Sequence, residues 1–160
     1  MRLVEPHIVT MELILWRHAE AEDGFPDLER KLTSKGHKQA EKVAAWLKPR
    51  LPKNTHILVS PAKRTQQTAA ALGLDFTTLD ALAPGVSPES ILRAAGWPDE
   101  TESVLIIGHQ PTLGAVAAQV LAQLDTALSV KKGAVWWLSA QIHDDEIHAA
   151  LRTVISPELL

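Results

Sequence analysis

The chain has 160 residues, of which 46% are hydrophobic and 22% charged, a size and composition typical of one soluble domain with a buried core. The formal net charge of −3 provides no basic excess for a nucleic-acid backbone, and no apolar run approaches the roughly 20 residues of a membrane span. Because there is no cysteine, disulfides, thiolate catalysis and cysteine-based zinc sites are excluded. We expect a cytoplasmic protein that binds neither nucleic acid nor a membrane.

The first predicted strand covers Glu12–Trp16 and stops at an arginine–histidine pair. It is apolar on both faces, which is typical of a strand in the middle of a parallel sheet. Upstream, Glu5 and Pro6 interrupt what would be the apolar region of a signal peptide. We therefore interpret residues 1–10 as an N-terminal tail or leader and residues 11–160 as a single domain.

Helices and strands alternate along the rest of the chain. After a polar loop from Glu20 to Arg30, the next predicted elements are a helix that Thr33 caps and Pro49 and Pro52 end, a strand over His56–Val59 and a helix over Ala62–Leu72. They are followed by a short extended piece (Phe76–Leu79), a helix beginning at Ser87-Pro88-Glu89, a strand over Val104–Ile107, a helix over Thr112–Leu124, and two strands over Ala134–Ile142 and Ile147–Val154. This order predicts an α/β three-layer sandwich with a mostly parallel central sheet and an antiparallel edge strand.

Three of the predicted strands end at polar residues that could meet in space. The first strand delivers Arg17 and His18, the second delivers Ser60 with Arg64 one turn into the next helix, and the third delivers His109. Ligands in open α/β sheets bind outside the carboxyl ends of the strands, and helix N-termini there favour an anion. Arginine forks match phosphate oxygens without a metal, so the pattern predicts a phosphate site.

Residue types also suggest the chemistry of this site. One histidine can attack phosphorus when it is neutral, which is common near pH 7 for an ordinary imidazole. The other can donate a hydrogen bond, preferably as a cation, to the phosphoryl oxygens. The residues alone do not decide which histidine has which role.

Four ordered motifs resemble those of the histidine phosphatase superfamily, which has a phosphoglycerate mutase-like fold. They are Arg17-His18-Ala19, Leu32–Ala40, Ser60–Ala69 and Gly108-His109-Gln110-Pro111, and they cover Met11 to about Leu124. The resemblance implies a phosphohistidine intermediate at His18, with Arg17, Arg64 and His109 as catalytic and phosphate-binding residues around the phosphoryl group. We expect neither a metal nor a cofactor. Ala19 replaces the family's glycine, and its methyl group would tighten the pocket or shift the loop.

Within the superfamily, the small size is similar to the SixA type, the bacterial protein phosphohistidine phosphatases. The segments Glu20–Arg30 and Asp75–Thr101 are too short to build a lid, so a side chain of another protein could enter. No glutamate precedes Glu89 in the segment where related mutases carry a general acid, and Asp80 is an uncertain substitute. A phosphohistidine has a labile P–N bond and needs little help from an acid, so this resemblance favours a phosphohistidine-bearing protein as the substrate and partner.

Two alternatives stay open. The chain could be a phosphatase of a small phosphate ester, or a module that binds phosphate or a phosphoprotein without turnover. The loop acids could form an ordinary solvated surface, or could contribute to substrate choice or proton transfer; they are Glu20, Glu22, Asp23 and Asp27. The remaining features receive structural interpretations: a polar hairpin turn over His143–Glu146, core packing for Trp16, and one buried and one half-exposed residue in Trp136-Trp137.

Overall fold

The structure is a computed structural model that describes residues 9–99 and 102–160. Its centre is a six-stranded sheet with the order β3-β2-β4-β1-β5-β6. The strands are β1 (Val9–Arg17), β2 (His56–Val59), β3 (Thr77–Thr78), β4 (Val104–Gly108), β5 (Val135–His143) and β6 (Glu146–Ile155). The first four strands of this chain run parallel, whereas β5 is antiparallel to β1 and β6 is antiparallel to β5. The predicted α/β class with a mostly parallel sheet and an antiparallel edge is therefore confirmed.

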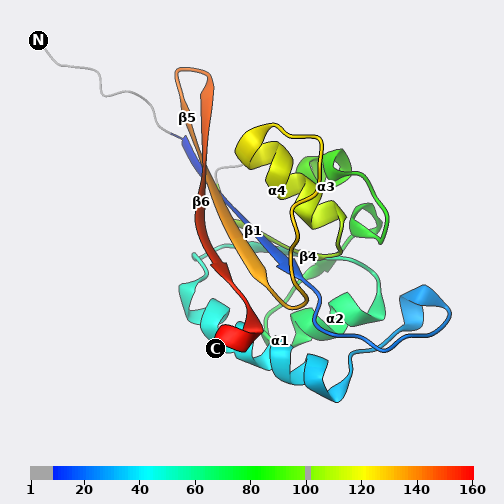
Figure 1. The fold of residues 1–160 in the computed structure, drawn as a ribbon. Helices are drawn as coiled ribbons and strands as arrows, with labels where there is room; N and C mark the ends of the chain where they lie inside the picture. The colour runs from blue at the N-terminus through cyan, green and yellow to red at the C-terminus, as the bar shows by residue number, and fades with distance from the viewer. Residues whose placement is uncertain (1–8, 100–101) are drawn as a thin grey trace, which may run out of the picture.

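Helices cover both faces of the sheet, as Figure 1 shows. They are α1 (Ser34–Leu47), α2 (Lys63–Ala70), α3 (Pro88–Ala95) and α4 (Thr112–Ala122), with 3-10 turns at Asp27–Glu29, Lys48–Arg50, Asp80–Leu82 and Pro157–Leu159. Alternation along β1 explains the layers, because Leu13 and Leu15 pack towards α3 and α4 while Ile14 and Trp16 pack towards α1 and α2. All four of these side chains are fully buried. The described helices include none long and apolar enough to cross a membrane.

The element boundaries differ from the predicted ones by a few residues. Strand β1 begins at Val9 instead of Glu12, and it is paired along its length with β5. The predicted tail falls mainly on residues 1–8, which lie outside the described residues. The predicted polar hairpin joins β5 to β6, and its central residues Asp144 and Asp145 have positive φ angles of 49° and 64°. Such angles match the twist of a tight hairpin.

The tryptophans lie where the sequence predicted. Trp16 is fully buried and its Nε1–H donates to the carbonyl oxygen of Gly133 at 3.0 Å. Trp137 is buried and Trp136 is half-buried. These contacts fix the end of β1 against the segment that precedes β5.

Gly36, in the first turn of α1, packs directly against the backbone of Glu20. A methyl group on Gly36 would overlap the carbonyl oxygen of Glu20, which also accepts the backbone N–H of Thr33 at 3.0 Å. We expect Gly36→Ala to lower the free energy of unfolding by about 2 kcal/mol, although alanine ordinarily stabilises a helix relative to glycine. Denaturant unfolding measures the change, with the exposed Lys38→Ala in the same helix as control. A stabilised Gly36→Ala protein would contradict the packing described.

Candidate active site

Backbone hydrogen bonds hold three strand ends together. The N–H of His18, just after β1, donates to the carbonyl oxygen of Gly108 in β4 at 3.1 Å. The N–H of Ser60, just after β2, donates to the carbonyl oxygen of Ile107 at 3.1 Å. Because β1 and β2 both pair with β4, their ends lie at the same edge of the sheet. The structure thus brings together the residues that the sequence placed at three separate junctions.

His18 is held as a neutral imidazole with one fixed proton. Its side chain is buried and its Nδ1 lies 2.7 Å from the carbonyl oxygen of Ala19. A carbonyl oxygen can only accept, so Nδ1 carries the proton and Nε2 keeps a free lone pair. Burial lowers the pKa of His18 to about 4, against the opposing effect of the Ala19 hydrogen bond and with added lowering by the charges of Arg64, Arg17 and Arg30. At neutral pH the Nε2 atom is therefore a competent nucleophile.

His109 faces His18 from the end of β4. The centroids of the two rings are 5.3 Å apart, and Nε2 of His109 lies 2.7 Å from Oγ of Ser60. Burial, followed by the charge of Arg64, lowers the pKa of His109 to about 3. Burial beside positive charge thus disfavours the cationic form of His109 in the protein without a bound ligand. When the Ser60 hydroxyl donates to Nε2, the neutral ring carries its proton on Nδ1 and can still donate from there.

Each of the two predicted arginines is anchored by part of its guanidinium. Arg17 donates from Nη1 to the carbonyl oxygen of Val130 at 2.9 Å, and burial lowers its pKa from the ordinary value. Arg64, whose side chain is 4% exposed, donates from Nη1 to the carbonyl oxygen of Asp27 at 2.8 Å and from Nη2 to its carboxylate at 3.1 Å. These bonds fix both side chains near the carboxyl ends of the strands.

Three nitrogens of these residues form what we call the donor cradle: Arg17 Nε, Arg64 Nε and His109 Nδ1. Within the described part of the chain, they are the buried side-chain polar atoms that have no hydrogen-bond partner. An unpaired buried donor costs about 1–3 kcal/mol, so natural proteins keep such groups mainly where a ligand satisfies them. A tetrahedral oxyanion supplies several acceptors at once. The donor cradle belongs to residues that lie near His18, and it therefore favours an oxyanion such as a phosphoryl group as the ligand of this site.

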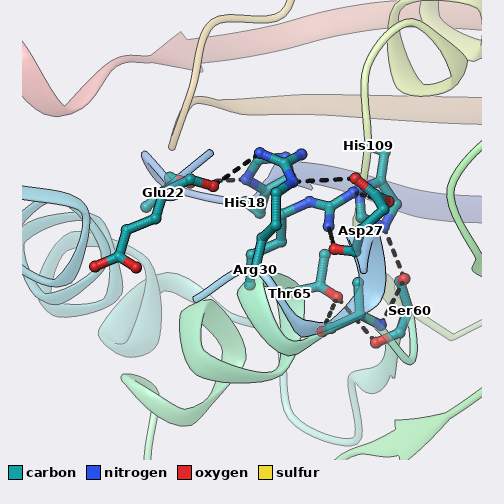
Figure 2. Close-up of polar contacts among 10 residues, drawn as sticks. His18, Glu22, Asp27, Arg30, Ser60, Thr65 and His109 are labelled. Carbon is teal, nitrogen blue, oxygen red and sulfur yellow. Dashed lines mark hydrogen bonds and ion pairs between the residues drawn. The ribbon is translucent and has the colours of Figure 1, made fainter. Parts of the chain in front are cut away.

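Asp27 joins the site from the loop between β1 and α1. Its carboxylate bridges two arginines, accepting from Arg64 Nη2 at 3.1 Å and from Arg30 Nε at 3.0 Å (Figure 2). Slight burial acts to raise the pKa of Asp27, but the hydrogen bonds from Arg64 and Arg30 outweigh it and hold the pKa below its usual value. Asp27 is therefore ionised at neutral pH. The sequence grouped Asp27 with the acidic loop but gave no sign of this contact, because it requires the loop to fold back onto α2.

The two carboxylates considered as a general acid, Asp80 and Glu89, lie on the chain between β3 and α4. Asp80 begins a 3-10 turn and Glu89 lies in the first turn of α3, and both are exposed. Among the described residues, neither side chain makes a hydrogen bond or ion pair with the site. The structure thus places an ionised aspartate, Asp27, beside Arg64 in place of a protonated acid.

Ala19 fits its position without backbone strain. Its φ angle is not positive, and its N–H donates to Oγ1 of Thr68 at 3.1 Å. The methyl group is buried in a small cluster with Leu32 and Ala40. The methyl group thus packs inside the protein at the end of β1, and its effect on the pocket and loop stays a prediction.

Comparison with known proteins agrees with this geometry. The histidine phosphatase superfamily (branch 1) matches residues 13–83, a range that includes Arg17, His18 and Arg64. An uncharacterized Mycobacterium tuberculosis protein is 36% identical over 108 residues. This match spans 63% of this chain and 66% of that protein, which is just under two thirds of its length. The phosphohistidine phosphatase SixA of Escherichia coli is 29% identical over 119 residues, or 69% of this chain and 74% of SixA.

A solved structure matches nearly the whole chain. It is assigned as a phosphohistidine phosphatase SixA from Nakamurella multipartitia, and its TM-score is 0.76 at 30% identity. The superposition covers 96% of this chain and 99% of that one, so it includes all three strand ends and both helical layers. This chain therefore belongs to the histidine phosphatase superfamily.

Proposed function

We propose that this protein is a metal-independent phosphatase that removes the phosphoryl group from phosphohistidine in another protein, through a covalent intermediate on His18. The observation that carries the proposal is the donor cradle in front of a neutral His18. Membership of the superfamily supports a phosphatase, and the SixA-type relatives support phosphohistidine as the substrate. The identity of the partner protein and a cytoplasmic location stay predictions.

In the first step, Nε2 of His18 attacks the phosphorus atom in line with the substrate P–N bond. The new P–N bond to His18 forms as the substrate P–N bond breaks. The departing histidine takes the electron pair of the broken bond and keeps the proton on its other ring nitrogen, while phosphorylated His18 keeps its Nδ1 proton and becomes an imidazolium. The cradle N–H groups of Arg17 and Arg64 and the Nδ1–H of His109 donate to the phosphoryl oxygens throughout. Donors fixed before reaction stabilise the transition state without reorganising.

In the second step, water attacks the phosphorus atom of the phosphorylated His18. The P–N bond to His18 breaks and its electron pair returns to Nε2, while the proton of the attacking water passes to phosphate or solvent. The Nδ1–H bond to the Ala19 carbonyl holds the ring in one orientation during both steps. Inorganic phosphate leaves, and the neutral imidazole is restored.

The carboxylates around the site favour a phosphoramidate over an ester. Asp27 is ionised between two arginines, so it has no proton to give a leaving group. An imidazole leaves readily because it is protonated near neutral pH, whereas an alkoxide needs an acid. The absence of a protonated carboxylate at the described site therefore disfavours alkyl phosphate esters.

A discharge assay tests the proposal. Purified protein is mixed with a phosphotransfer domain carrying phosphohistidine, and separately with a panel of phosphate esters. We expect rapid loss of phosphohistidine, slow ester cleavage, and a loss of more than about a thousandfold in His18→Ala, because the nucleophile is gone. The exposed His37→Ala is the matched control and should keep full activity.

The same assay separates the alternatives. Fast ester cleavage with untouched phosphohistidine would identify a small-molecule phosphatase instead. Calorimetric binding of tungstate, a stable phosphate mimic, with no turnover of any substrate would identify a binding module.

The lowered histidine pKa values predict how the protein responds to acid. An NMR titration should find His18 neutral, with its proton on Nδ1, from pH 8 to 5 and a midpoint near 4. In the unfolded protein each imidazole takes up a proton as the pH is lowered through 6.5, whereas in the folded protein His18 and His109 stay neutral. The free energy of unfolding should therefore fall as the pH is lowered from 6.5 to 5. The double variant His18→Asn/His109→Asn should flatten this dependence, whereas the exposed His148→Asn should leave it unchanged. A midpoint near 6.5 for His18 would refute the neutral-nucleophile geometry.

Asp27 should affect phosphate binding and turnover in opposite directions. Asp27→Asn removes a negative charge beside the Arg64 guanidinium, so we expect tungstate to bind more tightly. The gain should be about threefold in affinity, which is the typical effect of one charge pair screened by solvent. Turnover should fall about tenfold, because Nη2 of Arg64 loses its charged acceptor and only the backbone carbonyl of residue 27 still holds the guanidinium. Calorimetry and the discharge assay measure the two effects, with the exposed Asp125→Asn beyond α4 as control. Weaker tungstate binding with unchanged turnover would show that Asp27 has no such role.

A further inference from the structure

The loop that carries Asp27 also presents apolar side chains to solvent beside the site. Phe25 is 96% exposed and Leu28 is 48% exposed. An exposed phenylalanine forgoes the free energy of burying its ring, so such a side chain next to a reactive pocket points to a binding surface. Leu28 belongs to the same 3-10 turn as Asp27, which contacts Arg64 directly.

Contacts at several points hold this segment, residues 22–31, which we call the docking loop. The N–H of Glu22 donates to the carbonyl oxygen of Lys31 at 2.8 Å, which closes the loop at its base. Arg30 donates from Nη1 to the carbonyl oxygen of Glu22 at 3.1 Å and from Nε to Asp27, as Figure 2 shows. Asp27 in turn is fixed to Arg64 of α2. Phe25 is thus presented by a braced loop, which reduces the ordering cost of binding.

A cavity of about 200 Å³ lies within the docking loop beside Phe25. Three carboxylate side chains line it, those of Glu22, Asp23 and Glu29, together with the cationic side chains of Arg30 and Lys31, so acidic groups exceed basic ones by one. From Glu20 to Lys31 the chain has five carboxylates and two cationic side chains, so this stretch is acidic. An acidic cavity beside an aromatic ring fits a lysine or arginine side chain, which gains from both the carboxylates and the ring.

We propose that the docking loop recognises the substrate protein, with Phe25 and Leu28 contacting an apolar side chain and the acidic cavity receiving a lysine or arginine beside the phosphohistidine. The inference rests on the proposed function and specifies its partner. A protein carrying phosphohistidine to His18 must pass the docking loop, because Asp27 of this loop touches Arg64 at the phosphoryl site. A small phosphorylated molecule would reach His18 without contacting Phe25.

Synthetic phosphohistidine peptides test this recognition without knowledge of the natural partner. One peptide carries leucine and lysine beside the phosphohistidine, a second carries serine and glutamate, and free phosphohistidine is the third substrate. We expect the wild type to hydrolyse the first peptide with a kcat/KM about tenfold above the second, and Phe25→Ser to lower this preference to about threefold, since the acidic cavity is still present. The double variant Glu22→Lys/Asp23→Lys should reverse the preference for charge. Free phosphohistidine should be hydrolysed equally by all these proteins.

Leu124→Ser is the matched control, because Leu124 is 53% exposed but follows the far end of α4, roughly 16 Å along the helix from the site. It should keep the wild-type preference. Equal hydrolysis of both peptides by the wild type, or an unchanged tenfold preference in Phe25→Ser, would overturn the inference while leaving the phosphatase intact. A wild type that hydrolyses none of the three substrates would overturn the proposed function itself.

Discussion

The site depends on one constraint, the alignment of three strand ends by the sheet's own hydrogen bonds. The bonds from His18 to Gly108 and from Ser60 to Ile107 continue the parallel ladders of β1 and β2 with β4 beyond the last paired residues. A slip of two residues between β1 and β4 would move His18 by about 7 Å relative to His109, and the same slip between β2 and β4 would move Ser60 away from His109. The fully buried apolar side chains on both faces of β1 and β4 oppose such a slip.

Burying polar groups at this edge of the sheet costs free energy of folding. Arg17, Arg64 and His109 each keep a buried nitrogen without a partner, and both histidines are neutral because burial beside arginine disfavours a further charge. The same burial that destabilises these groups suits them to bind an oxyanion, because they need no reorganisation when the phosphoryl group arrives. These unpaired groups lower the free energy of unfolding, and the hydrophobic core on either side of the sheet offsets this loss.

The loop after β1 contributes to both proposed roles. Asp27 fixes Arg64 on the inner side of the loop, while Phe25 and Leu28 face solvent on the same short segment. In the proposed function, this single loop would supply an electrostatic contact to the phosphoryl site and an apolar contact to the substrate protein.

The sequence by itself determined the alternating elements, the mostly parallel sheet and the four residues that meet at its edge. These follow from local signals: the apolar run before Arg17-His18, the Ser60-Pro61 helix start, and the apolar strand before His109, combined with the rule that parallel strands share one carboxyl edge. Only the tertiary structure decided that Val130 anchors Arg17, that Asp27 bridges Arg64 and Arg30, and that His109 is neutral. The physical reason is that these features depend on the paths of irregular segments and on summed burial and charge, for which the chain carries no periodic pattern.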